Sequence, residues 1–357
     1  MRRRLLSRAS AFIAVAVLGL GAVALAATSS SPQDEPGNAS SAAGPPATEP
    51  YPEASDDPFR AFTSDSWWNT PLPSEVPTNP AADEILEYLS TAPESGGGCL
   101  KLAGAGDSPW GHPIYWAKPG DPVYNLDAVA HVRAKELESI RIPRSARPAS
   151  NNDGTMSIFD LQRKYVVALT NAEYDPDTRE WSAAGATVTY LNSNGLDAAT
   201  GQSDEPRNTG THRGNNGATM AVRWDMVQHG EIDHVLKIAA GPEVADRFVF
   251  PMVGSDGDYH GTDPAVPPSG LRMRIKPSID LESLNLSDQA LVIARALQEY
   301  GAYIGDSGGV TALKLENTMA EGRGQLWDVS ATDLCGLPFS AEYWDVLDED
   351  YDPTTAS

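Results

Sequence analysis

From Met156 onward, the chain consists of short apolar runs separated by glycine, proline and asparagine. Residues 156–174 read MSIFDLQRKYVVALTNAEY, the turn Asp175-Pro176-Asp177 follows, and a second run continues to residue 190. Apolar runs bounded by such turns are typical of hairpin strands. We predict further strands at residues 234–239, 247–251, 271–276 and 302–304. Many short strands with few long helices favour a mainly β fold, here a β-sandwich or jelly roll.

Only a few short helices are predicted, and we expect them to cover the sheets. One spans residues 80–89 and has two acids in its first turn, a second carries Met220, Trp224 and Val227 at helical spacing and ends at Gly230, and a third runs from the cap Ser287 to Gly301. Caps, first-turn acids and terminal glycines of this kind mark helix ends.

The N-terminus carries the pattern of a secretory signal. Four arginines precede an apolar run at residues 11–25, and Ala24-Leu25-Ala26 closes it. This run is shorter than the roughly 20 apolar residues that span a bilayer, so we predict cleavage after Ala26 and no stable membrane insertion afterwards. Residues 27–58 are a Ser-, Pro- and Ala-rich leader with few large apolar side chains, and we expect it to be flexible. The prediction is therefore a secreted, extracellular protein whose residues 59–357 form a single β-rich domain.

The chain is strongly acidic. Its formal net charge is −23, and loss of the four signal arginines changes this to −27. Nucleic acid and anionic membranes are repelled by such a surface, so we predict no nucleic-acid partner. High negative charge also keeps an exported protein soluble, which is the simpler explanation.

Cys99 and Cys335 are the two cysteines of the chain. An even count in an oxidising compartment predicts a disulfide between them, and a pair of buried thiols is the alternative. Neither cysteine has a neighbouring ligand at zinc spacing, so we predict no metal site.

Three carboxylates lie at turns or strand ends. Asp153 lies in the turn that precedes the strand beginning at Met156, Asp160 lies seven residues further on, and Asp306 follows the apolar residues 302–304 and precedes two glycines. A carboxylate at a strand end beside a tight loop is well placed to meet a ligand. Turn formation is the alternative for Asp153 and Asp306, and a structural hydrogen-bonding role is the alternative for Asp160.

Residues 211–240 hold the densest group of ionisable side chains. Asp233 is a further candidate catalytic acid there, and His234 is a candidate to orient or tune one of the acids. We also assign substrate-binding roles in this segment to His212, Asn216 and Glu231. The two histidines at 229 and 234 do not form a zinc-binding HExxH helix. A buried structural role is the alternative for any single histidine.

Basic and aromatic residues supply further candidates for substrate contacts. Arg272 lies on the polar face of the strand at 271–276, where it either pairs with the protein's own carboxylates or holds the acid group of a uronic sugar. Among the tryptophans, Trp181, Trp110 and Trp116 are the best candidates for exposed sugar-stacking platforms. No cofactor is required, and structural calcium bound by the acids of the loop at residues 255–263 is the alternative.

Several segments together resemble a known group of proteins. They are IRIPRSARPASNNDGTMSIFD, the W-x-A-x-G-A run at residues 181–186, GEIDHVL, RFVFP, PPSGLRMRIKPSIDL and ALQEYGAYIGDSGG. This set is similar to a widespread group of secreted, largely uncharacterised bacterial β-sandwich proteins with carbohydrate-active features. The resemblance covers roughly residues 59–309, and it implies recurrent polar positions at Asp153, Asp160, His234 and Asp306.

These observations lead to three functional hypotheses. The first is a secreted glycoside hydrolase that acts on an extracellular or cell-wall polysaccharide through paired carboxylates, with Asp153, Asp233 and Asp306 preferred and Asp160 or Glu231 in reserve. The second is a polysaccharide lyase acting on a uronic-acid polymer. The third is a non-catalytic sugar-binding protein of the cell envelope.

Overall fold

The computed structural model describes residues 57–106, 108–126, 134–210, 214 and 216–352. All of these residues belong to one compact unit. The expected signal at residues 1–26, the expected leader up to residue 56, and His212 lie outside the described residues.

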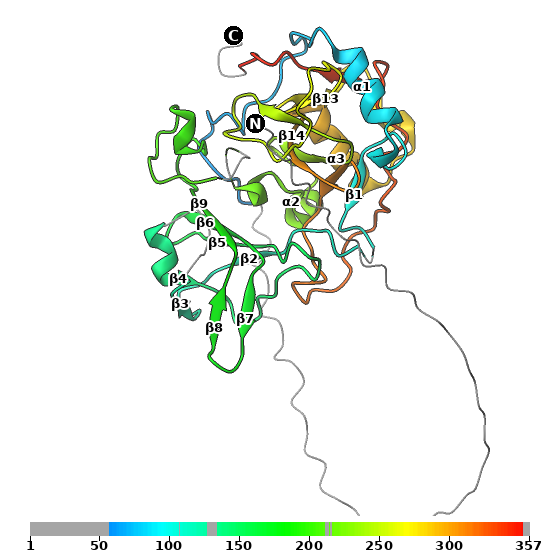
Figure 1. The fold of residues 1–357 in the computed structure, drawn as a ribbon. Helices are drawn as coiled ribbons and strands as arrows, with labels where there is room; N and C mark the ends of the chain where they lie inside the picture. Colours follow the sequence, from blue (N-terminus) through cyan, green and yellow to red (C-terminus); the bar gives the residue numbers. More distant parts are fainter. Residues whose placement is uncertain (1–56, 107, 127–133, 211–213, 215, 353–357) are drawn as a thin grey trace, which may run out of the picture. The chain divides into compact units, whose positions relative to one another are not determined.

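The described chain is mainly β, which confirms the predicted fold class (Figure 1). Three α-helices and five short 3₁₀ turns accompany the strands. The helices are α1 (Ala82–Thr91), α2 (Trp224–His229) and α3 (Asp288–Glu299). The strands are β1 (Lys101–Ala103), β2 (Ile114–Trp116), β3 (Val123–Tyr124), β4 (Ile140–Arg141), β5 (Met156–Asp160), β6 (Tyr165–Thr170), β7 (Glu173–Asp175), β8 (Glu180–Ser182), β9 (Gly185–Tyr190), β10 (Leu236–Ala240), β11 (Ala245–Phe248), β12 (Pro268–Ser269), β13 (Arg272–Ile275), β14 (Ala302–Ser307), β15 (Ala312–Lys314) and β16 (Trp344–Val346). Within the described ranges, no helix is long and apolar enough to cross a membrane.

The largest sheet has six strands in the order β1-β15-β10-β14-β13-β16. Two neighbouring pairs, β1/β15 and β10/β14, are parallel, and the other three are antiparallel. Apolar side chains of its strands share one core cluster with side chains of all three helices. Because side chains alternate between the two faces of a strand, the opposite face carries the residues in between, which include Lys237, Arg272, Tyr303 and Lys314.

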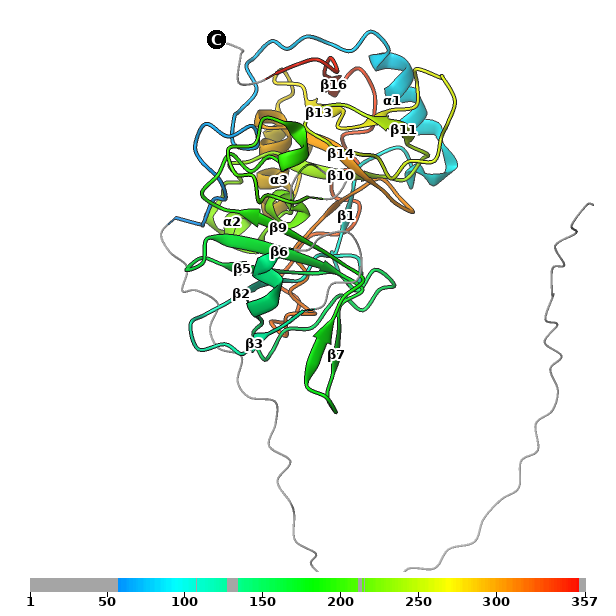
Figure 2. The same ribbon diagram turned by 60° about the vertical axis from the view of Figure 1, so that its left-hand side comes forward.

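A second sheet has four strands in the order β2-β5-β6-β9. Strands β5, β6 and β9 are antiparallel neighbours, as the apolar runs and turns predict. The hairpin of β7 and β8 continues from β6 and β9, and Figures 1 and 2 show it projecting beyond this sheet. A core cluster joins the two sheets, because Ile114 and Phe159 of the second sheet pack with Tyr303 of the first. The finer prediction of a sandwich or jelly roll stays a prediction.

The predicted helix ends agree with the structure for α3. The Ser287 hydroxyl accepts a hydrogen bond from Ala290 N at 3.3 Å, and the chain turns at Gly301, whose φ of +69° suits glycine. Of the residues at helical spacing before Gly230, Met220 lies instead in a separate 3₁₀ turn that precedes α2.

The disulfide between Cys99 and Cys335 is confirmed. It links residues that are 236 positions apart, close to the edge strand β1. Backbone pairing reinforces the link, since Phe339 N donates to Gly98 O at 2.9 Å. The Lys101 ammonium lies 3.1 Å from each sulfur.

Candidate functional site

The strongest candidate site is a cluster of charged residues on the polar face of the six-stranded sheet. Asp306 on β14 accepts a hydrogen bond from the Lys237 ammonium at 3.0 Å, and the Lys314 ammonium lies 4.0 Å from the same oxygen. Two of the chain's seven lysines therefore meet one carboxylate. Adjacent ammonium groups favour the ionised form of a carboxylate, which is the form that a nucleophile or base requires.

A β-bulge places Asp306 on this face. Along β14, Ala302 and Ile304 point into the apolar core, so strict alternation would send Asp306 there too. The pairing with β10 shifts between Ile238 and Ala239, which leaves Gly305 as the extra residue on β14. The bulge reverses the alternation and turns Asp306 toward Lys237.

Glycine at position 305 also gives Lys237 the room to reach Asp306. A Cβ at this position would lie 3.0 Å from Cγ and 3.1 Å from Cδ of Lys237. The aliphatic stem of the lysine therefore lies against a residue without a side chain. The sequence places a glycine immediately before the acid, and this local choice permits the ion pair.

A second carboxylate lies beside Asp306 on a neighbouring loop. Asp256 accepts hydrogen bonds from Ser307 N at 3.0 Å and from Ser307 Oγ at 3.2 Å. Because Ser307 directly follows Asp306, covalent geometry limits the separation of the two carboxyl groups to about 9 Å. We call Lys237, Asp256, Asp306 and Lys314 the Asp306 cluster.

The Asp306 cluster lies where parallel strands end. Strands β10 and β14 run parallel, and Asp306 and Ser307 close the carboxyl end of β14. The Asp306 side chain keeps 9 % of its surface exposed, and Ser307 is exposed.

The other predicted acids have different partners, and none of their described contacts joins them to Asp306. Asp153 belongs to an Asn-Asp-Gly turn, in which its N–H donates to Asn151 Oδ1 at 3.1 Å. The buried Asp160 lies 3.4 Å from Arg141 and 3.6 Å from Arg163. The contacts of Asp153 are those of a turn residue, and the contacts of Asp160 are those of a structural acid. Both match the alternatives to a catalytic role that the sequence analysis gives for these residues.

The described contacts of Asp233 and His234 also do not include the Asp306 cluster. The half-exposed Asp233 pairs with Arg60 at 3.2 Å. His234 is buried, and its Nδ1 hydrogen-bonds to Val235 O at 2.8 Å. Burial lowers the pKa of His234 to about 4, so its ring is neutral at neutral pH. These are the contacts of a structural histidine.

Two predicted substrate-binding residues, Asn216 and Arg272, are used inside the fold. The buried Asn216 caps a 3₁₀ turn by accepting a hydrogen bond from Ala218 N at 3.0 Å. Arg272 is also buried and donates to Tyr300 O from Nε at 3.0 Å. The cations of this strand were expected either to pair with the protein's own carboxylates or to hold a uronic acid. Arg274 pairs with a carboxylate of the protein, since it lies 2.9 Å from Asp345.

The predicted sugar platforms differ in their exposure. Trp181 was expected to be exposed, but it is buried in the core of the second sheet. Its ring centroid lies 5.3 Å from that of Tyr174. Trp116 is half-buried and stacks on Phe159, with 4.7 Å between the ring centroids. Trp110 is exposed, as predicted, and so is Glu231.

A buried pair of glutamates was not found from the sequence. Arg323 Nη1 lies 2.8 Å from Glu316 and 3.0 Å from Glu321, so one guanidinium bridges two carboxylates. Burial raises the pKa of Glu316, and burial together with the neighbouring Glu316 raises the pKa of Glu321 well above its usual range. Glu316 accepts from Trp224 N at 2.7 Å and Glu321 from Ile114 N at 2.8 Å. This pair therefore ties α2 to β2, and no local signal marks these residues in the sequence.

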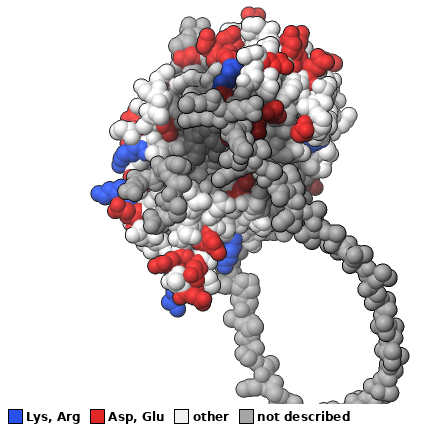
Figure 3. All heavy atoms as spheres, viewed as in Figure 1, with Lys and Arg blue, Asp and Glu red and all other residues white. Residues whose placement is uncertain are grey.

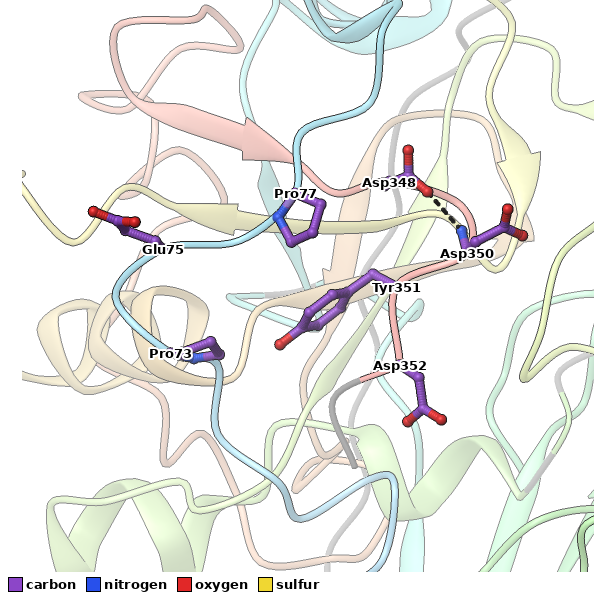
Figure 4. A pocket seen from close by; sticks show the side chains of 7 residues that line it. All are labelled: Pro73, Glu75, Pro77, Asp348, Asp350, Tyr351 and Asp352. Atoms are coloured by element: carbon purple, nitrogen blue, oxygen red, sulfur yellow. Dashed lines mark hydrogen bonds between the residues drawn. The ribbon is translucent and has the colours of Figure 1, made fainter. Parts of the chain in front are cut away.

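A hollow of about 360 Å³ is lined by a different set of residues. Figure 4 shows it between the segment of Pro73 and Pro77 and the C-terminal segment, with the ring of Tyr351 pointing toward the prolines. Four acids line it, namely Glu75, Asp348, Asp350 and Asp352.

No metal-binding group is found in the described part of the chain. Within it, no three or more histidine, cysteine, aspartate or glutamate side chains come together in a way that could hold a metal ion. In the loop considered for calcium, Asp256 binds Ser307, and Asp263 accepts from Ala265 N at 3.0 Å. A structural calcium ion there stays a prediction.

Comparison with known proteins gives no relative: no protein-family model, curated protein or solved structure matches this chain. The resemblance noted from the sequence segments therefore stays a prediction, and the functional proposal depends on the residues themselves.

Proposed function

We propose that this protein is an exported carbohydrate-active enzyme, a glycoside hydrolase that cleaves an extracellular or cell-wall polysaccharide at the Asp306 cluster. The observation that carries the proposal is the position of Asp306: a carboxylate that pairs with two lysines at the carboxyl end of the parallel strands β10 and β14, with the Asp256 carboxylate on the adjoining loop. Glycoside hydrolysis requires two carboxyl groups that flank the scissile bond.

The two acids would take different roles. Asp306, paired with Lys237 and Lys314, acts as nucleophile or as the base that activates water. Asp256 supplies the second carboxyl group that the reaction requires. Their separation limit of about 9 Å accommodates both the short spacing of retaining enzymes and the longer spacing of inverting enzymes. Asp153, Asp160 and Asp233 have structural partners and are not needed in this scheme.

Substitution of Asp306 tests the proposal directly. Purified exported protein is incubated with a panel of plant and bacterial polysaccharides, and released sugars are measured by chromatography. We expect Asp306→Asn to reduce the rate by at least about 100-fold, because it removes the acid-base or nucleophilic group. Asp177→Asn, in an exposed turn, is the matched control and should keep full activity.

The other outcomes separate the alternatives. Full activity in folded Asp306→Asn would contradict the assignment of the site. Products that absorb ultraviolet light from a uronic-acid polymer would replace hydrolysis by the lyase reaction. Glycan binding without any product, unchanged in Asp306→Asn and Asp256→Asn, would favour the non-catalytic sugar-binding protein.

A further inference from the structure

Trp110 is the tryptophan that the fold leaves open to solvent. Its exposed fraction is 44 %, whereas the other seven tryptophans of the chain are buried or half-buried. Tryptophans ordinarily contribute large apolar area to cores and interfaces. An indole that packs into neither is available to stack on a ligand.

The residues on either side of Trp110 are held firmly. Pro109 O accepts a hydrogen bond from Asn151 Nδ2 at 3.1 Å, and His112 N donates to Leu315 O at 2.8 Å. Gly111 lies against Gly104 so closely that a Cβ on Gly104 would come within 2.8 Å of Gly111 Cα. A ring presented from an anchored segment loses little conformational freedom on binding, which favours affinity.

Polar and apolar residues lie on the two segments that are hydrogen-bonded to the segment of Trp110. The bond from Asn151 Nδ2 to Pro109 O joins this segment to the turn of Asn152 and Asp153. The bond from Asn317 N to His112 O, at 2.9 Å, joins it to the turn of Met319, which is 54 % exposed. We call Trp110, Met319, Asn152 and Asp153 the Trp110 surface.

The chemistry of the Trp110 surface fits a sugar better than the other classes of partner. A pyranose has an apolar face that stacks on indole, and hydroxyls that bond to amide and carboxylate groups. A protein partner needs about 800 Å² on each side, whereas a tryptophan offers at most about 250 Å². The formal net charge of −23 and the carboxylate of Asp153 disfavour an anionic chain.

We propose that the Trp110 surface is a subsite that binds one pyranose ring of a neutral oligosaccharide, with the ring stacked on Trp110 and its hydroxyls bonded to Asn152 and Asp153. The ligand class rests on the proposed function. The residues differ from those of the Asp306 cluster, so this subsite holds a polymer chain while cleavage takes place elsewhere along it.

Binding measurements with matched variants test this subsite. Exported protein labelled with 5-fluorotryptophan is titrated with cellohexaose, xylohexaose, maltohexaose and chitohexaose, with hexagalacturonate as the anionic probe. The ¹⁹F resonance of Trp110 is assigned by its absence in Trp110→Phe. We expect at least one neutral hexamer to shift this resonance, and we expect Trp110→Ala to weaken its binding about fivefold or more. Phe248→Ala, an equally exposed aromatic on β11, should bind as the wild type does.

The possible failures are distinguishable. Hydrolysis with an unshifted Trp110 resonance, or with unchanged binding in Trp110→Ala, overturns the subsite and leaves the proposed function standing. Binding that depends on Trp110 but gives no product in wild type or Asp306→Asn supports the subsite and overturns the hydrolase. A preference for hexagalacturonate, or no binding of any neutral hexamer, overturns the subsite.

Discussion

The contacts of His234 support one of the two roles that its sequence context allows. Its position beside Asp233, within a dense group of ionisable residues, suits a histidine that tunes a catalytic acid, and a buried structural role is the alternative. In the fold it is buried, it hydrogen-bonds to Val235 O, and Asp233 pairs with Arg60. The described hydrogen bond of the ring is that of the structural alternative.

Burial of His234 predicts a loss of stability in acid. Its pKa is about 4 in the folded protein and about 6.5 in an unfolded chain. Because the folded pKa is the lower, its contribution is fully present above pH 6.5 and is lost as the pH falls toward 4. The loss is at most about 3 kcal/mol. Urea unfolding between pH 4 and 7 should show a steeper loss in wild type than in His234→Asn, and equal slopes would contradict this account.

At the scale of the element, strand β14 shows how one glycine decides the site. Period-two alternation predicts that Asp306 lies on the same face as Ala302 and Ile304, in the apolar core. The bulge at Gly305 changes the face, and Lys237 and Lys314 on two neighbouring strands then meet the carboxylate. The sequence marks Asp306 as a candidate, whereas no local signal marks Lys237 or Lys314 as its partners.

Substitution of Gly305 by alanine should disturb this arrangement. The new Cβ would crowd the stem of Lys237, so we expect the free energy of unfolding to fall by about 1–3 kcal/mol and polysaccharide cleavage to fall with it. The matched control is Gly309→Ala, because a Cβ there would meet nothing within 4 Å. Denaturant unfolding and activity assays on both variants provide the measurement. Equal free energies of unfolding and equal activities in the two variants would show that a methyl group at position 305 does not displace Lys237.

At the scale of the whole molecule, surface charge and the disulfide are the features that the sequence predicts best. The face drawn in Figure 3 carries many more acidic than basic side chains, in keeping with the formal net charge of −23. The disulfide joins the neighbourhood of β1 to a segment 236 residues later. Closure of so long a loop restricts the unfolded chain strongly.

Removal of the disulfide should therefore cost stability rather than chemistry. We expect Cys99→Ser/Cys335→Ser to lower the free energy of unfolding by about 2–4 kcal/mol. Activity of the folded fraction should be unchanged, since Asp306 and its partners make no described contact with either cysteine. Denaturant unfolding and assays of wild type and the double variant provide the measurement, and non-reducing mass spectrometry verifies the bond in the wild type. Lost activity at full stability would show that the cysteines have a chemical role.

The sequence by itself determined the mainly β character, the hairpin of β5 and β6, the cap of α3 and the cysteine pair. These depend on local patterns: alternation, turn residues, a capping serine and a count of cysteines. Asp306 was also recognisable, because a carboxylate between an apolar run and two glycines is a local signal.

Only the tertiary structure decided which groups surround that acid. Lys237, Asp256 and Lys314 come from three other segments, and strand pairing with a bulge brings them to Asp306. The same holds for Glu316 and Glu321, which are buried against Arg323 by the meeting of α2 and β2. Burial and long-range pairing depend on how distant segments pack. The spacing of residues within one segment does not predict which distant residues that segment will contact.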